Sequence, residues 1–259
     1  MVPATGSAVI GTSGERTIPA SISLVLLTLN EVEGVTALLP FLRDRAKLSV
    51  DEVFAVDGGS TDGTLEQYAR YGIRVHRQRS RGRGEAIRIA CDSTNADCLV
   101  YFSPDGNEDW RDIARFRNYF EQGFEFVIAS RMMAGAYNEE DSSWLRPRKW
   151  ANNAFNWAAN AFFNRGGAYV TDSINGFRGI RRDLLADLAL DATGFTIEYQ
   201  MSIRAMRRGV KIAEFPTHES PRIAGSTKAH SIPTGLRFLK CLWDELRSAP
   251  PRKVLPQRR

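Results

Sequence analysis

Residues 101–109, Tyr-Phe-Ser-Pro-Asp-Gly-Asn-Glu-Asp, place an acidic turn directly after a run of apolar residues. The apolar run Cys98–Phe102 is typical of a buried strand, and Asp105, Asn107 and Glu108 follow it at once. Ligands of open α/β sheets bind beyond the carboxyl ends of the strands, and hard oxygen donors there suit a divalent cation that bridges phosphates. An acidic turn can also do no more than cap the following helix, so the neighbouring segments decide between the two interpretations.

Two earlier segments repeat this pattern of an apolar run followed by a polar turn. Ile22–Leu29 is a mostly apolar run of strand length that ends at Asn30, and Glu52–Val56 leads into a glycine-rich turn. Helical spacing of apolar residues separates these predicted strands, and such alternation predicts a parallel sheet with right-handed crossovers. The sequence therefore predicts an α/β fold that gathers three polar turns at one edge of the sheet: Thr28–Glu31, Asp57–Asp62 and Ser103–Asp109.

The three turns together predict a nucleotide pocket. Carboxylates can accept hydrogen bonds from a base or a ribose, and glycine-rich turns let a phosphate approach backbone N–H groups. No Walker-type phosphate loop is present, and Arg81–Gly84 is not a dinucleotide fingerprint because no suitable strand precedes it. Aromatic motifs of the RNA-binding type are missing, which argues against nucleic acid as a partner.

The second half of the chain holds weaker strand signals and two apolar helices. Phe124–Ala129 predicts a strand, the polar loop that follows to Pro147 is a candidate lid, and Val210–Phe215 predicts an edge strand. A helix over residues 148–163 is apolar on most sides, and burial in the core is favoured over contact with lipid. The last helix is amphipathic, with its apolar residues at Leu236, Leu239, Leu242, Trp243 and Leu246.

The composition of the chain limits further which classes of protein it can belong to. The chain has 259 residues, of which 43% are apolar and 25% charged, as in an ordinary globular protein. No run of about 18 apolar residues is present, and residues 1–20 form a flexible tail without the pattern of a signal peptide, which favours the cytoplasm. Three scattered cysteines fit neither a disulfide framework nor a zinc site. The net charge of +5, with a basic tail over 248–259, suits a phosphorylated substrate or an anionic membrane surface.

The motifs resemble glycosyltransferase family two, the inverting GT-A type. In the first half they are Leu26–Glu31, Val56–Thr64, Arg81–Gly84 and Ser103–Asn107. The second half is similar to the dolichol- or polyprenol-phosphate-mannose synthase branch, through Asp172–Arg178, Arg222–Lys228 and, more loosely, Arg148–Asn156. The resemblance covers about residues 21–245. It implies a single GT-A domain over 21–247, with a Rossmann-like, mostly parallel sheet flanked by helices, a nucleotide-sugar half at 21–130 and a C-terminal acceptor-side half at 131–247.

The resemblance also implies a role for each matching residue. The nucleotide sugar would contact Thr28, Asn30, Glu31, Asp57, Gly59, Arg81, Gly82, Pro104, Asp105, Arg222 and Lys228, of which the last two would clamp the diphosphate. A divalent cofactor, Mg²⁺ or Mn²⁺, would bind Asp105 and Asn107. The acceptor phosphate would meet Arg131, Arg148 and Asn152. The catalytic residues would be Asp105, Arg131 and Asp172.

Three departures from the family pattern stand out. Ser103 occupies the position of the first acid in the family's Asp-x-Asp metal motif, so that either Glu108 or Asp109 compensates or the metal binds weakly. The family's Gln and Glu are exchanged here, as Glu198 and Gln200. No membrane helices follow the catalytic part, so any contact with a membrane would be peripheral or through a membrane-anchored partner.

Three functions are consistent with these residues. The favoured hypothesis is an inverting transferase that moves a sugar, mannose first, from GDP-mannose or else a UDP-sugar to polyprenyl or dolichyl phosphate, because arginines suit a phosphate acceptor that needs no general base. In the second hypothesis the same fold glycosylates a hydroxyl of a saccharide or small metabolite, with Asp172 as the base. The third is a nucleotide-binding protein that lost catalysis with the acid at Ser103.

Overall fold

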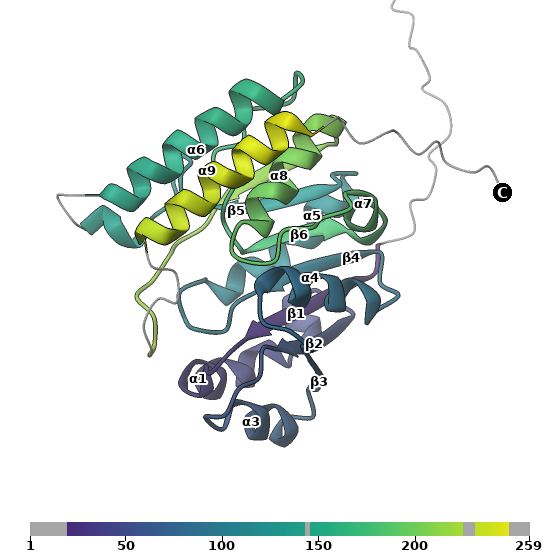
Figure 1. Ribbon diagram of the computed structural model, residues 1–259. Coiled ribbons are helices and arrows are strands. Elements are labelled where there is room, and N and C mark those ends of the chain that lie inside the picture. The colour runs from purple at the N-terminus through teal and green to yellow at the C-terminus, as the bar shows by residue number, and fades with distance from the viewer. Residues whose placement is uncertain (1–19, 143–145, 225–230, 249–259) are drawn as a thin grey trace, which may run out of the picture.

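The computed structural model describes residues 20–142, 146–224 and 231–248 (Figure 1). The predicted tails, 1–20 and 248–259, lie outside these ranges except for Ala20 and Ser248. The described helices are α1 (Val32–Leu42), α2 (Arg45–Leu48), α3 (Thr64–Arg70), α4 (Arg83–Asp92), α5 (Arg115–Glu121), α6 (Pro147–Phe163), α7 (Arg182–Asp187), α8 (Ile197–Arg208) and α9 (Ser231–Arg247), with short 3₁₀ helices η1 (Trp110–Ala114) and η2 (Glu139–Ser142).

A seven-stranded sheet forms the centre of the molecule. Its strands are β1 (Ile22–Thr28), β2 (Glu52–Asp57), β3 (Arg74–Arg77), β4 (Cys98–Phe102), β5 (Phe126–Ser130), β6 (Arg178–Arg181) and β7 (Ile212–Pro216). The spatial order is β3-β2-β1-β4-β6-β5-β7, and β6 runs antiparallel to both of its neighbours while the other pairs are parallel. The predicted mostly parallel α/β sheet is therefore confirmed, and the strand predicted near 210–215 lies at the edge as expected.

The strand β6 was not predicted from the sequence. It has only four residues, and its glycine, Gly179, packs so closely that an added Cβ would lie 2.8 Å from the rings of Phe116 and Phe120. An apolar run signals a strand, but here arginine and glycine occupy three of the four positions. The segment is a strand because β4 and β5 pair with it on both sides.

Alternation along the strands separates two apolar layers. Val25 and Leu27 of β1 face the layer of α4, α6, α7, α8 and α9, whereas Leu24 and Leu26 face the layer that contains α1 and α5. Figure 1 shows α6 and α9 side by side on the outside of α8. In the described residues no helix is both long and apolar enough to cross a membrane.

The prediction that the helix over 148–163 is buried in the core was wrong for its largest side chains. Trp150, Trp157 and Phe162 are exposed, and only Asn156, Phe163 and two alanines of α6 are buried. Core and surface helices of the same apolar composition cannot be distinguished when polar residues, here asparagines, occupy the inward face.

Helix α1 packs directly against the acidic turn that follows β4. A Cβ on Gly34 would lie 2.2 Å from the carbonyl oxygen of Pro104 and 3.0 Å from Cα of Asp105. Gly34→Ala is therefore expected to lower the free energy of unfolding by about 1–3 kcal/mol, although alanine normally stabilises a helix. Urea denaturation would measure this, with Gly194→Ala as the control because its Cβ would meet no atom within 4 Å. A Gly34→Ala variant as stable as the wild type would contradict the close packing.

Candidate active site

Hydrogen bonds hold the turns after β1 and β2 in place and join them to each other. Thr28 and Asp57 are paired at the carboxyl ends of the two strands. The Asp57 carboxylate accepts hydrogen bonds from N–H of Gly59 (2.9 Å) and from N–H and Oγ of Ser60 (2.8 and 2.5 Å). Asn30, at φ 52°, accepts from N–H of Thr61 (2.9 Å). Asp57, Asn30 and Gly59 thus build the turns.

A cavity of about 750 Å³ opens along this edge of the sheet. Its lining includes ten of the predicted site residues: Thr28, Glu31, Arg81, Gly82, Asp105, Asn107, Arg131, Arg148, Asn152 and Arg222. Five predicted residues are outside the lining: Asn30, Asp57, Gly59, Pro104 and Asp172. Lys228 lies outside the described residues. The cavity therefore brings together the polar turns after β1 and β4 and the arginines of the second half of the chain.

The acidic turn after β4 is joined to the segment that carries Arg222. N–H of Ile223 donates to the Asp105 carbonyl (2.9 Å), and the amide of Asn107 donates to the Ser220 carbonyl (2.6 Å). Gly106, at φ 87°, permits this approach, because a Cβ there would lie 2.4 Å from the Ile223 side chain. Arg222 Nη1 consequently lies 2.7 Å from Oδ2 of the buried Asp105.

An ion pair on the cavity wall, between Arg83 and Glu198, was not predicted from the sequence. Arg83 forms an ion pair with the buried Glu198, and its Nη1 lies 3.4 Å from Oγ of Ser103. Glu108 accepts a hydrogen bond from N–H of Ser103 (2.8 Å), and burial together with the nearby Asp105 charge raises the pKa of Glu108 to about 8. The Arg81–Gly84 motif and the Glu198 exchange were the only signals for the ion pair, since its members are 115 residues apart in sequence.

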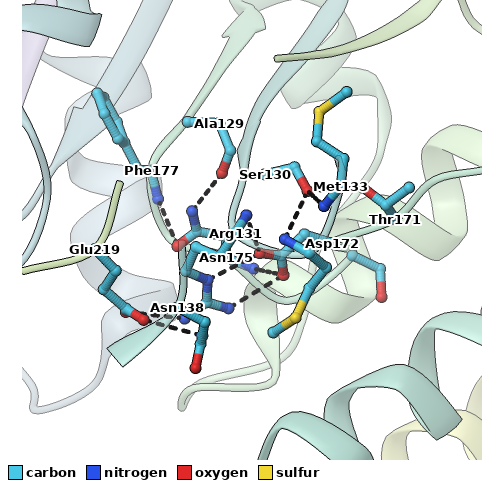
Figure 2. A network of polar contacts seen from close by, with 12 residues as sticks. Ala129, Ser130, Arg131, Met133, Asn138, Thr171, Asp172, Asn175, Phe177 and Glu219 are labelled. Atoms are coloured by element: carbon cyan, nitrogen blue, oxygen red, sulfur yellow. Dashed lines mark hydrogen bonds and ion pairs between the residues drawn. The ribbon is translucent and has the colours of Figure 1, made fainter. Parts of the chain in front are cut away.

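Arg131 is held at the end of β5 by two carboxylates (Figure 2). Its Nε and Nη2 donate to the two oxygens of Asp172 (2.8 and 3.1 Å), and Nη1 lies 3.3 Å from Glu219. Asp172 is fully buried and also accepts from N–H of Arg131 and of Asn175 (both 3.1 Å). Burial alone would raise the pKa of Asp172, but the Arg131 guanidinium outweighs it and holds that pKa below its usual value. Asp172 thus fixes the orientation of the Arg131 guanidinium.

Glu219 was not identified from the sequence, although it lines the cavity. Its Oε2 accepts from the Asn138 amide (3.0 Å) and from N–H of Glu139 (3.1 Å), which ties the predicted lid segment to the site. At the same side, Arg148 of α6 donates to Glu140 and Glu139 (2.8 and 2.6 Å). Arg131 and Arg148 are therefore already oriented by acidic partners.

The donor set at the acidic turn fits a divalent ion that is shared with a diphosphate. Asp105, Asn107 and Glu108 all line the cavity and offer hard oxygen atoms. Among the described residues no three His, Cys, Asp or Glu side chains come together as a complete metal cage. Mg²⁺ commonly takes one or two carboxylates and completes its shell with phosphates and water, so this sparse set suits a metal that arrives with a nucleotide.

Comparison with known sequences identifies the family. The model of glycosyl transferase family 2 matches residues 23–189. From Haloferax volcanii, a dolichyl-phosphate hexose transferase is 30% identical (87% of this chain, 96% of the relative), and the glycosyltransferase AglJ is 29% identical (80% of this chain, 66% of the relative). The polyprenol monophosphomannose synthase of Mycolicibacterium smegmatis is 25% identical (81% and 82%).

Solved structures agree on the fold. Glucosyl-3-phosphoglycerate synthase from Mycobacterium tuberculosis, in complex with Mn²⁺, UDP and phosphoglyceric acid, superimposes with a TM-score of 0.69 at 18% identity, over 88% of this chain and 79% of that chain. The sheet order and flanking helices thus form a GT-A fold. The hypothesis of a non-catalytic binding protein is not supported, since the family and the relatives are transferases. The chain belongs to glycosyl transferase family 2 and is a glycosyltransferase related to polyprenyl-phosphate sugar transferases.

Proposed function

We propose that this enzyme transfers a sugar, with mannose as the first choice, from a nucleotide sugar to a polyprenyl or dolichyl phosphate with inversion at the anomeric carbon. GDP-mannose is the favoured donor and a UDP-sugar the second. One observation carries the proposal: a single cavity has Asp105 and Arg222 in its lining together with Arg131, which follows β5, and Arg148, in the first turn of α6. One end suits a leaving diphosphate and the other an anionic acceptor.

The proposed reaction is a direct displacement. A phosphate oxygen of the acceptor forms the new bond to the anomeric carbon of the sugar, and the bond to the donor diphosphate breaks, so that the nucleoside diphosphate leaves with its electron pair. A lipid phosphate is already anionic, and no proton has to be removed from it. Asp172 is engaged by Arg131 and does not line the cavity, which suits this acceptor better than a hydroxyl, since a hydroxyl would need a free base.

The residues of this chain have separate tasks in this proposal. Asp105, Asn107 and Glu108 would hold the divalent metal, which neutralises the diphosphate when bound. Arg222 pairs with Asp105 here and would turn to the donor diphosphate. Arg131 would orient the acceptor phosphate, and Asp172 is a positioning residue that fixes the guanidinium plane of Arg131. The finding that a structural relative was crystallised with Mn²⁺ and UDP supports the metal and nucleotide parts.

Product analysis tests the proposal directly. Purified enzyme with Mn²⁺, GDP-mannose and a polyprenyl phosphate is expected to yield polyprenyl-phosphate mannose, identified by mass spectrometry. The matched acceptor is the corresponding polyprenol, which has the same chain and a terminal hydroxyl but no phosphate, and no product is expected from it. Transfer to the polyprenol or to a saccharide hydroxyl at a comparable rate would overturn the phosphate acceptor. UDP-sugars in parallel reactions decide the nucleotide.

Glu108 is expected to supply the carboxylate that Ser103 lacks. Glu108→Gln keeps the hydrogen bond from N–H of Ser103 but removes the charge, and we expect Mn²⁺ to bind the enzyme–GDP complex about 10- to 100-fold more weakly. Electron paramagnetic resonance of free Mn²⁺ would measure this without any turnover. Asp109→Asn is the control, because Asp109 caps η1 and pairs with Arg111, outside the cavity lining. Equal Mn²⁺ affinity in Glu108→Gln and wild type would exclude Glu108 as a ligand.

A further inference from the structure

The outer faces of α6 and α9 carry most of the large exposed apolar side chains of the described chain. Seven of them lie on these two helices, each 41–65% exposed: Trp150, Trp157 and Phe162 on α6, and Leu236, Leu239, Trp243 and Leu246 on α9. The two helices lie side by side (Figure 1) and touch through Phe155 and Phe238, whose ring centroids are 5.3 Å apart. We call these seven residues the α6–α9 face.

The α6 part of this face is free of charge. From Trp150 to Phe163 the helix contains no acidic or basic residue, and Trp150, Ala154, Trp157 and Ala161 recur along its exposed side. The two charged residues in its first turn are already paired, Arg148 with Glu139 and Glu140, and Lys149 with Asp141. A solvent-facing helix surface without charge is unusual for a helix that contacts only water.

Successive side chains of an α-helix are rotated by about 100° around its axis, and those of α9 consequently form three strips along the helix. The inward strip is Phe238, Cys241 and Glu245, and a charged outer strip follows on one side: Arg237, Lys240, Asp244 and Arg247. The apolar outer strip of Leu236, Leu239, Trp243 and Leu246 lies on the other side. On the inward strip, Glu245 pairs with Arg204 and Arg207 of α8, whereas Phe238 packs against Phe155 of α6. The apolar strip therefore adjoins α6, and the face is continuous across both helices.

The two helices that carry the α6–α9 face also line the cavity. Arg148 and Ala151 near the start of α6, and Gly235 and Arg237 in the first half of α9, line the same cavity as Asp105 and Arg222. A molecule that covers the α6–α9 face would therefore also border the acceptor end of the cavity.

We propose that the α6–α9 face docks on a lipid bilayer that contains anionic lipids, and that the cavity mouth thereby opens at the bilayer surface. This inference rests on the proposed function for the statement that the acceptor is a membrane lipid. Tryptophan side chains at the edge of an apolar face match the headgroup region, where one end of the ring system is apolar and the other wet.

The charge beside the α6–α9 face favours a bilayer over a second copy of the chain as the partner of this face. The charged strip of α9 has three basic residues against the single acid Asp244, which pairs with Lys240, so that Arg237 and Arg247 leave an excess of positive charge. Two copies joined through this face would bring these like charges together, whereas anionic headgroups complement them. The ion-paired Arg148 and Lys149 add no excess charge of their own.

Vesicle co-sedimentation tests the docking surface. The full chain is expected to bind vesicles of phosphatidylcholine and phosphatidylglycerol, and to bind about 10-fold more weakly to phosphatidylcholine alone or at high salt. The double variant Trp157→Ser, Trp243→Ser should bind the mixed vesicles at least about 10-fold more weakly than wild type. Neither tryptophan lines the cavity, and both are exposed, so the fold should tolerate the changes. The control is Phe41→Ser, which removes an exposed apolar ring from α1 in the other helix layer.

The vesicles contain no polyprenyl phosphate, so that binding is measured independently of the transfer reaction. Transfer is measured separately with a water-soluble, short-chain prenyl phosphate, and the double variant should keep wild-type turnover on it. Vesicle binding without any transfer would refute the proposed function and leave the docking surface intact. Transfer without vesicle binding, equal binding of wild type and double variant, or a dimer that sedimentation shows to depend on the two tryptophans would overturn the docking surface.

Discussion

Asp105→Asn is expected to abolish sugar transfer, with a fall in kcat of about 10³-fold or more. The reason is that, in the proposed mechanism, both the metal and Arg222 depend on the Asp105 carboxylate for their place beside the departing diphosphate. In the proposed metal site, Asp105 is 5% exposed and lies 2.7 Å from Arg222. Asparagine retains the shape and the hydrogen bond that Oδ1 accepts from N–H of Asn107 (3.0 Å), so the turn should persist. The loss would therefore come from the missing charge, which serves both the metal and Arg222.

Two measurements separate this outcome from unfolding. The thermal midpoint of the variant without ligand should change little, whereas the stabilisation that wild type gains from GDP with Mn²⁺ should disappear. Stabilisation by GDP without metal is expected to survive in part, since Thr28 and Glu31 also line the cavity. An Asp105→Asn variant that still responds to Mn²⁺ or retains a tenth of the wild-type rate would contradict a metal site centred on Asp105.

Local sequence was sufficient to place several polar side chains at one edge of the sheet. A strand ends where its apolar run ends, and the turn that follows must lie at the carboxyl edge of a parallel sheet. Thr28, Glu31 and Asp105 could be placed for that reason, and all three line the cavity. The position of a residue at the end of a strand does not show whether its side chain lines the cavity or stabilises the turn. Asp57 occupies the predicted strand end, yet two backbone N–H groups and a hydroxyl surround its carboxylate.

Partners distant in sequence escaped prediction because nothing local signals them. Glu219 follows β7 without a motif, and it meets Arg131 only because β7 pairs with β5 in the sheet. Arg83 and Glu198 meet across the cavity from α4 and α8. The exposure of Trp157 is a comparable case, since which side of α6 faces outward depends on where α8 and α9 pack.

The acceptor side can be tested by removing the arginine that the network in Figure 2 holds in place. Arg131→Ala is expected to lower kcat/KM for polyprenyl phosphate by about 10³-fold, with the affinity for GDP and Mn²⁺ unchanged. Arg131→Lys should recover only part of this loss, because an ammonium cannot reproduce the bidentate contact with Asp172 or present a planar fork to a phosphate. A weakened donor affinity in Arg131→Ala would instead place this residue on the nucleotide side.

Asp172→Asn distinguishes a positioning residue from a general base. Asparagine can still accept one hydrogen bond from Arg131, so we expect a fall in kcat of about 10-fold and an unchanged pH profile. Asp172→Ala would leave the buried guanidinium with Glu219 alone and should cost about 3–5 kcal/mol in the free energy of unfolding. If Asp172 were the base, Asp172→Asn would instead abolish transfer while the fold stayed intact. The pair Arg131→Ala and Asp172→Asn therefore decides whether this pocket activates a hydroxyl or receives an acceptor that is already charged.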